Sequence, residues 1–400
     1  MTQFSIKDGE LAIANKTVSE LVQIAGQTPC YIYDRNVIAH NIEQLREHFP
    51  RVSLHYAIKA NPYQPLVSFV ANLVDGLDVA SGKELRTALA TSISADDISF
   101  AGPGKSSTEL LMAIASGVTI NVESKTELER IITLAQANNT SANVALRLNP
   151  DFELKSSGMK MGGGSQQFGI DIEQLDPIFE LLKADGVSFK GLHIFTGSQN
   201  LNPQSLISAH DNIFALVQRL QQQYSFVLEH LNIGGGFGIP YFAGEQVLDL
   251  EPIAENLNSL FDQYKELVQD CEVILELGRY IVGNSGIYVS QITDKKVSRG
   301  QTYLITNGGL HHHLAASGNF GQVIRKNYPV DVANKMISND KEIVNVVGPL
   351  CTPLDILASK MELPVADIGD YIVVYQSGAY GFTASPRDFL SHAHPVELML

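Results

Sequence analysis

The chain has 400 residues, of which 44% are hydrophobic and 18% charged, and its formal net charge is −15 at pH 7. This composition predicts a soluble globular protein large enough for two domains, and the acidic balance argues against nucleic acid or a membrane surface as a partner. No apolar run approaches the roughly 20 residues that cross a bilayer, and residues 1–10 lack the basic start and apolar middle of a signal peptide.

From about residue 52, short apolar runs alternate with amphipathic stretches of helical length. The strand-like runs are 54–58, 77–80, 97–101, 118–122, 143–148, 190–195, 229–233 and 272–276. The helical stretches are 64–74, 82–92, 106–116, 124–138, 171–184, 203–223 and 250–269. This alternation predicts a TIM-like (β/α)8 barrel. A doubly wound open sheet is the alternative, but it needs fewer strands.

After residue 280 the pattern changes, and β-like runs at 286–293, 301–306, 342–347 and 370–375 are separated by loops. These runs predict a second, mostly β domain of the barrel or sandwich kind. Strand-like segments near 4–13 and 29–33 could open the first barrel or supply strands to the β domain, and the pattern alone favours neither.

Lys59 ends the first predicted barrel strand, at the edge where such barrels keep their chemistry. A lysine that is partly desolvated there can lose its proton and attack an aldehyde as an amine nucleophile. The alternative is a lysine whose ammonium group reaches from a strand end into water. Further polar residues close later strands: Asp78, Ser81, Arg147, Asn149, His193, Ser198, Glu276 and Arg279.

A glycine-rich segment, 234–238, follows the seventh predicted strand. Consecutive glycines cost backbone entropy, so they are favoured where the backbone approaches a ligand closely or adopts positive φ. Barrel enzymes bind phosphate with the loops after strands seven and eight, whereas a bare tight turn is the alternative for a glycine run. A phosphate site facing an amine predicts pyridoxal phosphate, held by Lys59 as a Schiff base.

Three other strand-end residues then acquire possible roles. His193 could stack on the cofactor ring, although a strand histidine is more often a satisfied core residue. Glu276 could pair with the pyridine nitrogen, or it could belong to a surface ion pair. Arg279 could bind the phosphate or a substrate carboxylate with two hydrogen bonds.

With these motifs in place, the sequence resembles the fold-type III pyridoxal phosphate decarboxylases, the family of diaminopimelate and ornithine decarboxylases. The resemblance covers essentially the whole chain. Its motifs are YAIKAN at 56–61, DVAS at 78–81, His193 with GSQ at 197–199, the glycines of 234–238, Glu276-x-Gly278-Arg279, GPLCTPLD at 348–355 and GAY at 378–380.

The resemblance implies a fold and an assembly. It implies a pyridoxal-binding barrel over 36–279 and a β domain formed by 1–35 and 280–400. The implied assembly is a homodimer with shared active sites, in which Cys351 from the second subunit returns a proton to Cα after carbon dioxide leaves. Lys59, His193 and Cys351 are the implied catalytic residues.

The implied binding residues fall into two groups, and no metal is implied. The cofactor-binding residues are Lys59, Asp78, His193, Ser198, Gly235, Gly236, Glu276, Gly278, Arg279 and Tyr380. The substrate-binding residues are Arg147, Arg279, Thr352, Asp355 and Tyr380.

The sequence departs from the family pattern where the substrate is chosen. Ornithine-type and diaminopimelate-type enzymes usually place an acid after the catalytic cysteine, where this chain has Thr352, and the latter also carry an arginine where this chain has Ala315. Asn307 stands where an aspartate is common. The groups that would pair a charged distal end are therefore missing, and such pairs discriminate strongly between substrates.

The segments 158–164 and 307–325 are similar to a biosynthetic subgroup, one member of which decarboxylates glutamate tethered to an acyl-carrier protein. Carrier proteins are acidic, so docking of one would need a patch of basic residues on this chain. Alternatively, each basic residue of such a patch could be an ordinary solvated charge. The candidates are Lys155, Lys160, Arg325 and Lys326.

The leading hypothesis is an amino-acid α-decarboxylase that uses pyridoxal phosphate: the substrate amine displaces Lys59, carbon dioxide leaves, and Cα is reprotonated. The substrate is a carrier-bound aminoacyl group or, alternatively, a free amino acid such as diaminopimelate or another L- or D-amino acid. A racemase is a further alternative, although Glu276 favours decarboxylation. A silent relative that only binds a partner would have lost Lys59 or Cys351, and both are present.

The cysteines and a histidine triplet bear on disulfide and metal sites. The three cysteines, Cys30, Cys271 and Cys351, lie far apart without metal-ligand spacing, which predicts a reducing, cytoplasmic compartment. The histidine triplet at 311–313 has no carboxylate or cysteine at a suitable spacing, so local packing and hydrogen bonding are favoured over metal binding.

Overall fold

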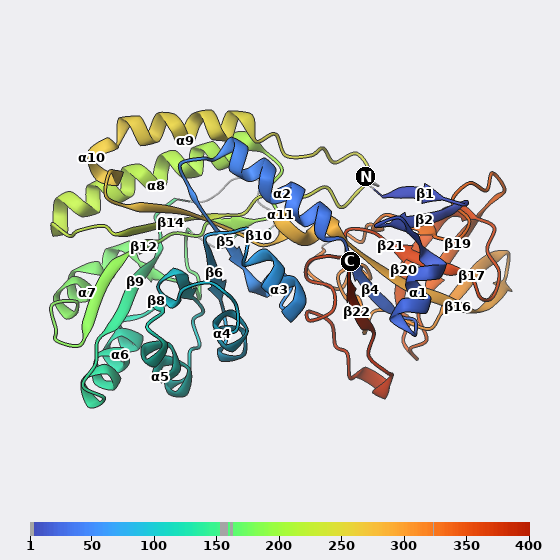
Figure 1. Ribbon diagram of the computed structural model, residues 1–400, viewed down its shortest axis with the longest axis horizontal. Coiled ribbons are helices and arrows are strands. Elements are labelled where there is room, and N and C mark those ends of the chain that lie inside the picture. The colour runs from blue at the N-terminus through green and yellow to red at the C-terminus, as the bar shows by residue number, and fades with distance from the viewer. Residues whose placement is uncertain (1–3, 153–158, 161–162, 323) are drawn as a thin grey trace. The chain divides into compact units, whose positions relative to one another are not determined.

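The computed structural model describes residues 4–152, 159–160, 163–322 and 324–400. The chain forms two compact units (Figure 1). One, which we call the barrel unit, comprises 40–239 and 246–280; the other, the β unit, comprises 1–39, 240–245 and 281–400. In the described part of the chain, no helix is both long and apolar enough to span a bilayer.

Eight parallel strands form the closed barrel of the barrel unit. They are β5 (Ser53–Ala57), β6 (Gly76–Val79), β7 (Ile98–Phe100), β8 (Thr119–Val122), β9 (Ala142–Asn149), β12 (Val187–His193), β14 (His230–Gly235) and β15 (Glu272–Leu277). Each pairs with the next, and β15 pairs with β5, which closes the ring. The predicted (β/α)8 barrel is therefore confirmed, and the alternative prediction of a doubly wound open sheet is wrong.

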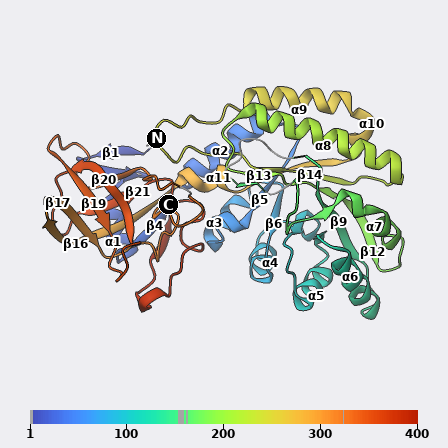
Figure 2. The ribbon, with the colours of Figure 1, turned by 180° about the vertical axis from the view of Figure 1, so that it is seen from behind.

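Helices lie outside these strands in both ribbon views (Figures 1 and 2). They are α2 (Arg35–His48), α3 (Gln64–Val70), α4 (Gly82–Leu89), α5 (Ser107–Ser116), α6 (Lys125–Ala137), α7 (Leu175–Leu181), α8 (Pro203–Tyr224), α9 (Glu251–Gln263) and α10 (Lys265–Val268). Every predicted helical stretch overlaps at least one of them, whereas α2 was not predicted. Ser106 caps α5 in a capping box with Glu109, and Ser124 caps α6.

The β unit is built mainly on one eight-stranded sheet. Its strands are β4 (Cys30–Tyr33), β16 (Gly286–Ser298), β17 (Gln301–Thr306), β18 (Val330–Val332), β19 (Lys341–Val347), β20 (Ile356–Pro364), β21 (Tyr371–Val374) and β22 (Val396–Met399). The first half of β16 pairs with β4 and β21, and its second half pairs with β17. The N-terminal β4 thus joins the C-terminal strands, as the family resemblance implied.

A small sheet and one helix complete the β unit. The sheet contains β1 (Ser5–Lys7), β2 (Glu10–Ile13) and β3 (Lys16–Thr17), and α1 (Val18–Ala25) follows it. Leu11 and Leu21 from these elements pack in one apolar core with Ile32, Ile287 and Val373. Burial of these side chains holds the N-terminal segment onto the C-terminal strands.

Candidate active site

Lys59 lies on a short 3-10 turn, Ile58–Ala60, directly after β5. Residues 54–57 of the strand and the two neighbours of Lys59 on the turn are buried, whereas the Lys59 side chain is 39% exposed. The turn therefore presents one ammonium group at the carboxyl end of the barrel, as the sequence predicted. The ring of Phe195 lies 5.2 Å from Lys59 Nζ and gives it an apolar, electron-rich neighbour that sequence reasoning missed.

Glu276 is the partner of this ammonium group. Its Oε1 lies 2.9 Å from Lys59 Nζ, and its Oε2 lies 3.2 Å from Nε2 of His193, the last residue of β12. Burial by itself would raise the pKa of the Glu276 carboxyl, but the charge of Lys59 and the contact with His193 outweigh it and hold this pKa well below its usual range. Glu276 is therefore a buried carboxylate that stays ionised at neutral pH.

The close approach of Lys59 and Glu276 follows from the packing of β15 on β5. The two strands pair in register, with Glu276 opposite His55 and Leu277 opposite Tyr56. At the end of β15, a Cβ on Gly278 would lie 2.8 Å from Ala60 Cβ and 3.0 Å from the Ala57 carbonyl. Only glycine lets the end of this strand lie against the turn that carries Lys59.

A second carboxylate belongs to the same neighbourhood. Glu84, in the first turn of α4, accepts a hydrogen bond from the Ala80 amide at 2.7 Å, and Ser81 caps the helix. Burial raises the pKa of Glu84, and the charge of Lys59 opposes that rise. Glu84 was not predicted, although its spacing from Ser81 is a helix-cap signal that could have drawn attention to it.

The glycine-rich segment packs against backbone from two neighbouring segments. Gly234 and Gly236 have positive φ angles of 71° and 74°. A Cβ on Gly235 would collide with the Glu276 carbonyl, and one on Gly236 with the Gly197 carbonyl. Ser198 follows Gly197 in a two-residue strand. Backbone conformation and packing thus require these glycines, and the segment lies beside the strand that carries Glu276.

Asp78 and Arg147 have other partners in the barrel. Asp78 accepts a hydrogen bond from Ser99 Oγ at 2.5 Å, and its Oδ1 lies 3.5 Å from His55 Nδ1. Arg147 Nη1 donates to Glu123 Oε1 at 2.9 Å in a buried ion pair, and its guanidinium lies 4.9 Å from the Phe168 ring.

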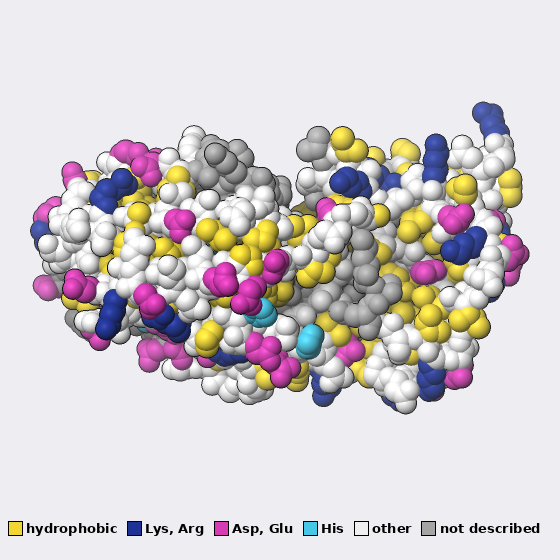
Figure 3. Space-filling model, turned by 90° about the horizontal axis from the view of Figure 1, so that it is seen from above, with side chains coloured by type: hydrophobic (Ala, Val, Ile, Leu, Met, Phe, Trp, Pro, Cys, Tyr) yellow, Lys and Arg dark blue, Asp and Glu magenta, His cyan; other side chains and the backbone are white. Residues whose placement is uncertain are grey.

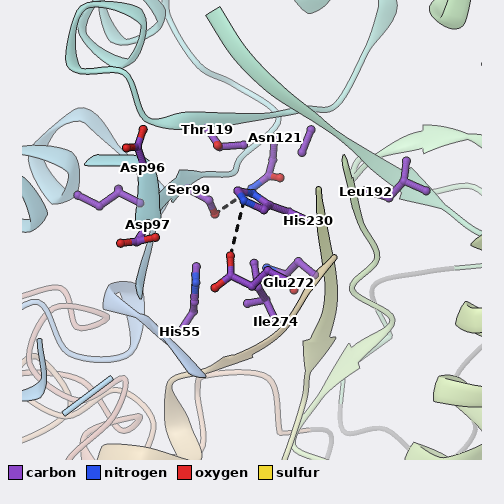
Figure 4. A pocket seen from close by; sticks show the side chains of 13 residues that line it. His55, Asp96, Asp97, Ser99, Thr119, Asn121, Leu192, His230, Glu272 and Ile274 are labelled. Carbon is purple, nitrogen blue, oxygen red and sulfur yellow. Dashed lines mark hydrogen bonds and ion pairs between the residues drawn. The ribbon is translucent and has the colours of Figure 1, made fainter. Parts of the chain in front are cut away.

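A small cavity lies at the opposite, amino-terminal ends of the barrel strands (Figure 4). The first residues of four strands line it, including His230 and Glu272, together with His55 and Asp97. Its volume is about 20 Å³, which is room for one water molecule. It is therefore too small for a cofactor or an amino-acid substrate.

Four predicted site residues belong to the β unit. Cys351 is exposed, Thr352 is half-buried, and Tyr380 is half-buried with a positive φ of 53°. Asp355 is 2% exposed and accepts hydrogen bonds from two backbone amides. The triplet His311, His312 and His313 is fully buried, and in the described residues no group of three His, Cys, Asp or Glu side chains could hold a metal ion.

The residues at the carboxyl end of the barrel fit pyridoxal phosphate. Lys59 offers an amine to the aldehyde, and Glu276 offers an ionised carboxylate to a protonated pyridine nitrogen. A carboxylate that is buried and ionised, as Glu276 is, would stabilise the protonated form of a ring nitrogen placed beside it. The arrangement defines a pyridoxal-dependent enzyme.

The comparisons with known proteins agree with this class. Residues 35–283 match the family described as "Pyridoxal-dependent decarboxylase, pyridoxal binding domain". The chain is 37% identical to L-glutamyl-[BtrI acyl-carrier protein] decarboxylase of Niallia circulans over 93% of this chain and 89% of that protein. It is 33% identical to diaminopimelate decarboxylase of Aquifex aeolicus over 95% of this chain and 88% of that protein.

A solved structure shows the same fold. The crystal structure of diaminopimelate decarboxylase from M. jannaschii superposes with a TM-score of 0.88 at 26% identity, and the match covers 99% of this chain and 92% of that one. The protein belongs to the pyridoxal-dependent decarboxylase family. The predicted fold-type III decarboxylase, its cofactor class and its carbon–carbon lyase chemistry are confirmed.

Proposed function

We propose that this decarboxylase acts on an aminoacyl group tethered to an acyl-carrier protein. The ionised Glu276 beside Lys59 supports the reaction, and the neutral side chains at Thr352 and Ala315 support the substrate class. Ala315 is 5% exposed and apolar, and the Thr352 hydroxyl accepts a hydrogen bond from the Leu354 amide at 3.3 Å. Neither residue can pair with a charged distal group. The 37% identity with a carrier-dependent glutamyl decarboxylase agrees with this choice.

Pyridoxal phosphate, when bound, supplies an aldehyde for the substrate amine and a protonated ring that accepts the electron pair released with carbon dioxide. Lys59 would hold the cofactor through its aldehyde, Glu276 would hold the proton on the ring nitrogen, and His193 would contact the ring. The remaining proposed cofactor contacts are Asp78, Ser198, Gly235, Gly236, Gly278, Arg279 and Tyr380.

Of the predicted substrate contacts, we propose Arg279, Thr352 and Tyr380, because Arg147 is paired with Glu123 and Asp355 with two backbone amides. We also propose that Cys351 returns the proton to Cα. We place Cys351 in the active site of a second subunit, in a cytoplasmic homodimer of barrels (36–279) and β domains (1–35 with 280–400). Exposure of Cys351 on its own β unit supports this role, because the thiol is accessible to a neighbouring molecule.

The proposed docking residues differ in their availability. Arg325 donates to the carbonyls of Ser317 and Ile356 at 3.0 and 2.9 Å, so its guanidinium is already engaged within the β unit. Lys326 is exposed, with Nζ 5.2 Å from the Phe242 ring, and remains a candidate. Lys155 lies outside the described residues. On the face seen in Figure 3, basic side chains are scattered among acidic and uncharged ones.

Decarboxylation of a free amino acid is the second candidate, because diaminopimelate decarboxylases are 33% and 32% identical to this chain. The deciding experiment gives the holoenzyme free L-glutamate, L-lysine, L-ornithine and meso-diaminopimelate and, in parallel, amino acids loaded on a carrier protein. Mass spectrometry then follows the loss of carbon dioxide. Turnover of the loaded set alone supports the proposal, and turnover of a free amino acid at comparable kcat/KM overturns it.

The cofactor attachment has a separate test. Borohydride reduction of the holoenzyme, followed by peptide mass spectrometry, should place the cofactor on Lys59. Lys59→Ala should remove both the adduct and the visible absorbance of the holoenzyme. A wild-type spectrum in that variant would exclude Lys59 as the attachment residue.

A further inference from the structure

Two loops of the β unit are fastened by a single buried carboxylate, that of Asp355. Its Oδ1 accepts the Leu310 amide at 2.6 Å, and its Oδ2 accepts the Leu350 amide at 2.9 Å. Leu310 precedes the histidine triplet, and Leu350 precedes Cys351. The two oxygens of one side chain therefore fix the backbone of both loops.

The same residue closes the turn on which Cys351 stands. The Asp355 carbonyl accepts the Gly348 amide at 3.1 Å, and the Asp355 amide donates to the Thr352 carbonyl at 3.3 Å. Between Gly348 and Asp355, the Thr352 amide donates to the Leu350 carbonyl at 2.8 Å. Cys351 is exposed at the outer side of the turn, while Asp355 is 2% exposed at its base.

Glycines on both loops leave room for this carboxylate. A Cβ on Gly309 would collide with Asp355 Oδ1, and a Cβ on Gly348 would collide with Oδ2. Any other residue at either position would push the carboxylate away from the amides that it accepts. The fit is thus built from both loops around the side chain of Asp355.

We infer that Asp355 is a positioning residue for Cys351 and not a substrate contact. The inference rests on the proposed role of Cys351 in returning a proton to Cα. A proton donor must be held within a fraction of an ångström of its productive position, and a displacement of about 1 Å can cost about 100-fold in rate. A side chain whose two oxygens are both engaged by backbone amides, at 2% exposure, serves this purpose.

The test uses Asp355→Asn, which keeps the shape but removes the charge and one acceptor oxygen. Asp331→Asn is the control, because Asp331 is a half-buried β-unit aspartate that likewise accepts a backbone amide, that of Val332 at 2.9 Å. Hydrogen exchange, measured by mass spectrometry, is followed in peptides that contain Leu310 and Leu350. Exchange there should accelerate at least tenfold in Asp355→Asn and stay at the wild-type rate in Asp331→Asn.

Kinetics with L-glutamyl carrier protein then separate positioning from substrate binding. Asp355→Asn should lower kcat about 10- to 100-fold, leave KM within threefold, and raise the fraction of product formed by protonation away from Cα. In a Cys351→Ala background, the same substitution should have no further effect on kcat or on products. A raised KM, or a full effect of Asp355→Asn in that background, overturns the inference.

Two further outcomes are distinguishable. Wild-type kinetics and products in Cys351→Ala refute the proposed role of the cysteine, whereas an impaired Cys351→Ala beside an unimpaired Asp355→Asn refutes only the positioning role. If Asp355→Asn does not fold, Asp355→Glu replaces it, because the longer side chain keeps the charge but displaces the carboxylate from both amides. Asp355→Glu should then show the same kcat loss and product change, and wild-type values would overturn the inference.

Discussion

Glu276→Gln removes one charge from the candidate active site without changing its shape. The wild-type carboxylate lies 2.9 Å from Lys59 Nζ and 3.2 Å from His193 Nε2, and it is 5% exposed. Its pKa is held well below the usual range despite burial, so it is ionised throughout the neutral pH range. Glutamine occupies the same volume but cannot hold a proton on a ring nitrogen as an anion does.

The expected loss is large because the charge acts in a buried site. Removing one preorganised electrostatic partner from such a site costs about 3–4 kcal/mol, or about 100- to 1,000-fold in rate. We therefore expect kcat/KM of Glu276→Gln to fall by about two to three orders of magnitude, mostly in kcat. Steady-state release of carbon dioxide, with cofactor occupancy checked by absorbance, measures this effect.

Glu272→Gln is the matched control for this experiment. Glu272 is the first residue of the same strand, and it lines the cavity at the opposite end of the barrel (Figure 4). The control should keep its activity within about twofold of wild type, because Glu272 is four positions away along the strand and faces the amino-terminal cavity. If Glu276→Gln retains kcat/KM within threefold of wild type, the assignment of Glu276 as the partner of the ring nitrogen is wrong.

The pH dependence of stability gives a second measurement on the same pair. The pKa of Glu276 is lower in the folded state than in the unfolded chain, so its ionised form stabilises the fold above the unfolded value of about 4.3. This contribution is lost as pH falls below that value toward the folded pKa. The difference in Tm between wild type and Glu276→Gln should therefore be constant at neutral pH and shrink below about pH 4.3.

Three further predictions concern buried charge, thiol access and acid stability. Lys105→Met should destabilise the barrel unit by about 3–5 kcal/mol in urea unfolding, because it leaves the buried Glu127 carboxylate, 3.0 Å from the Lys105 ammonium, without its cation. Adding Glu127→Gln to Lys105→Met should restore part of the lost stability. Iodoacetamide should alkylate the exposed Cys351 much faster than Cys30 and Cys271, because burial raises the thiol pKa of those two cysteines to about 12. Equal labelling of the three cysteines in peptide mass spectrometry would contradict this prediction. Burial lowers the pKa of His311 to about 4, so its neutral form stabilises the fold above the unfolded pKa of about 6.5, and this stability is lost as pH falls toward 4. His311→Leu should therefore make the fall of Tm with decreasing pH shallower. An unchanged slope of Tm against pH would refute that reasoning.

The barrel could be predicted because its strands are buried on both faces. Such strands are short continuous apolar runs, and eight of them at regular spacing leave few alternatives. The elements that were missed carry weaker patterns: β18 has three residues, and β20 is interrupted by four residues that are not buried, 359–362, in the middle of Ile356–Pro364. Helix α2 was missed because it precedes the first barrel strand, where the regular alternation had not yet begun.

The centre of the site could also be predicted, since strand number alone places Lys59, His193 and Glu276 on one edge of a parallel barrel. Phe195 and Glu84 were missed because their relation to Lys59 is tertiary. Neither an apolar strand residue nor a helix-cap glutamate carries a local signal of the lysine that it faces.

Asp355 and Arg147 show what a motif position cannot specify. Each is a charged residue in a family motif or at a strand end, which favours a substrate contact when the sequence alone is considered. Each is nevertheless engaged by its own unit: Asp355 by two amides, and Arg147 by the buried Glu123, which also accepts the amides of Gly102 and Gly169. A buried charge must be paired, and its partner can be the substrate or the protein itself. Because the pairing depends on backbone groups that carry no sequence signal, the partner becomes visible only in the folded chain. Substrate selection is then expected from side chains that the protein does not enclose, such as Thr352 and Tyr380, which are half-buried.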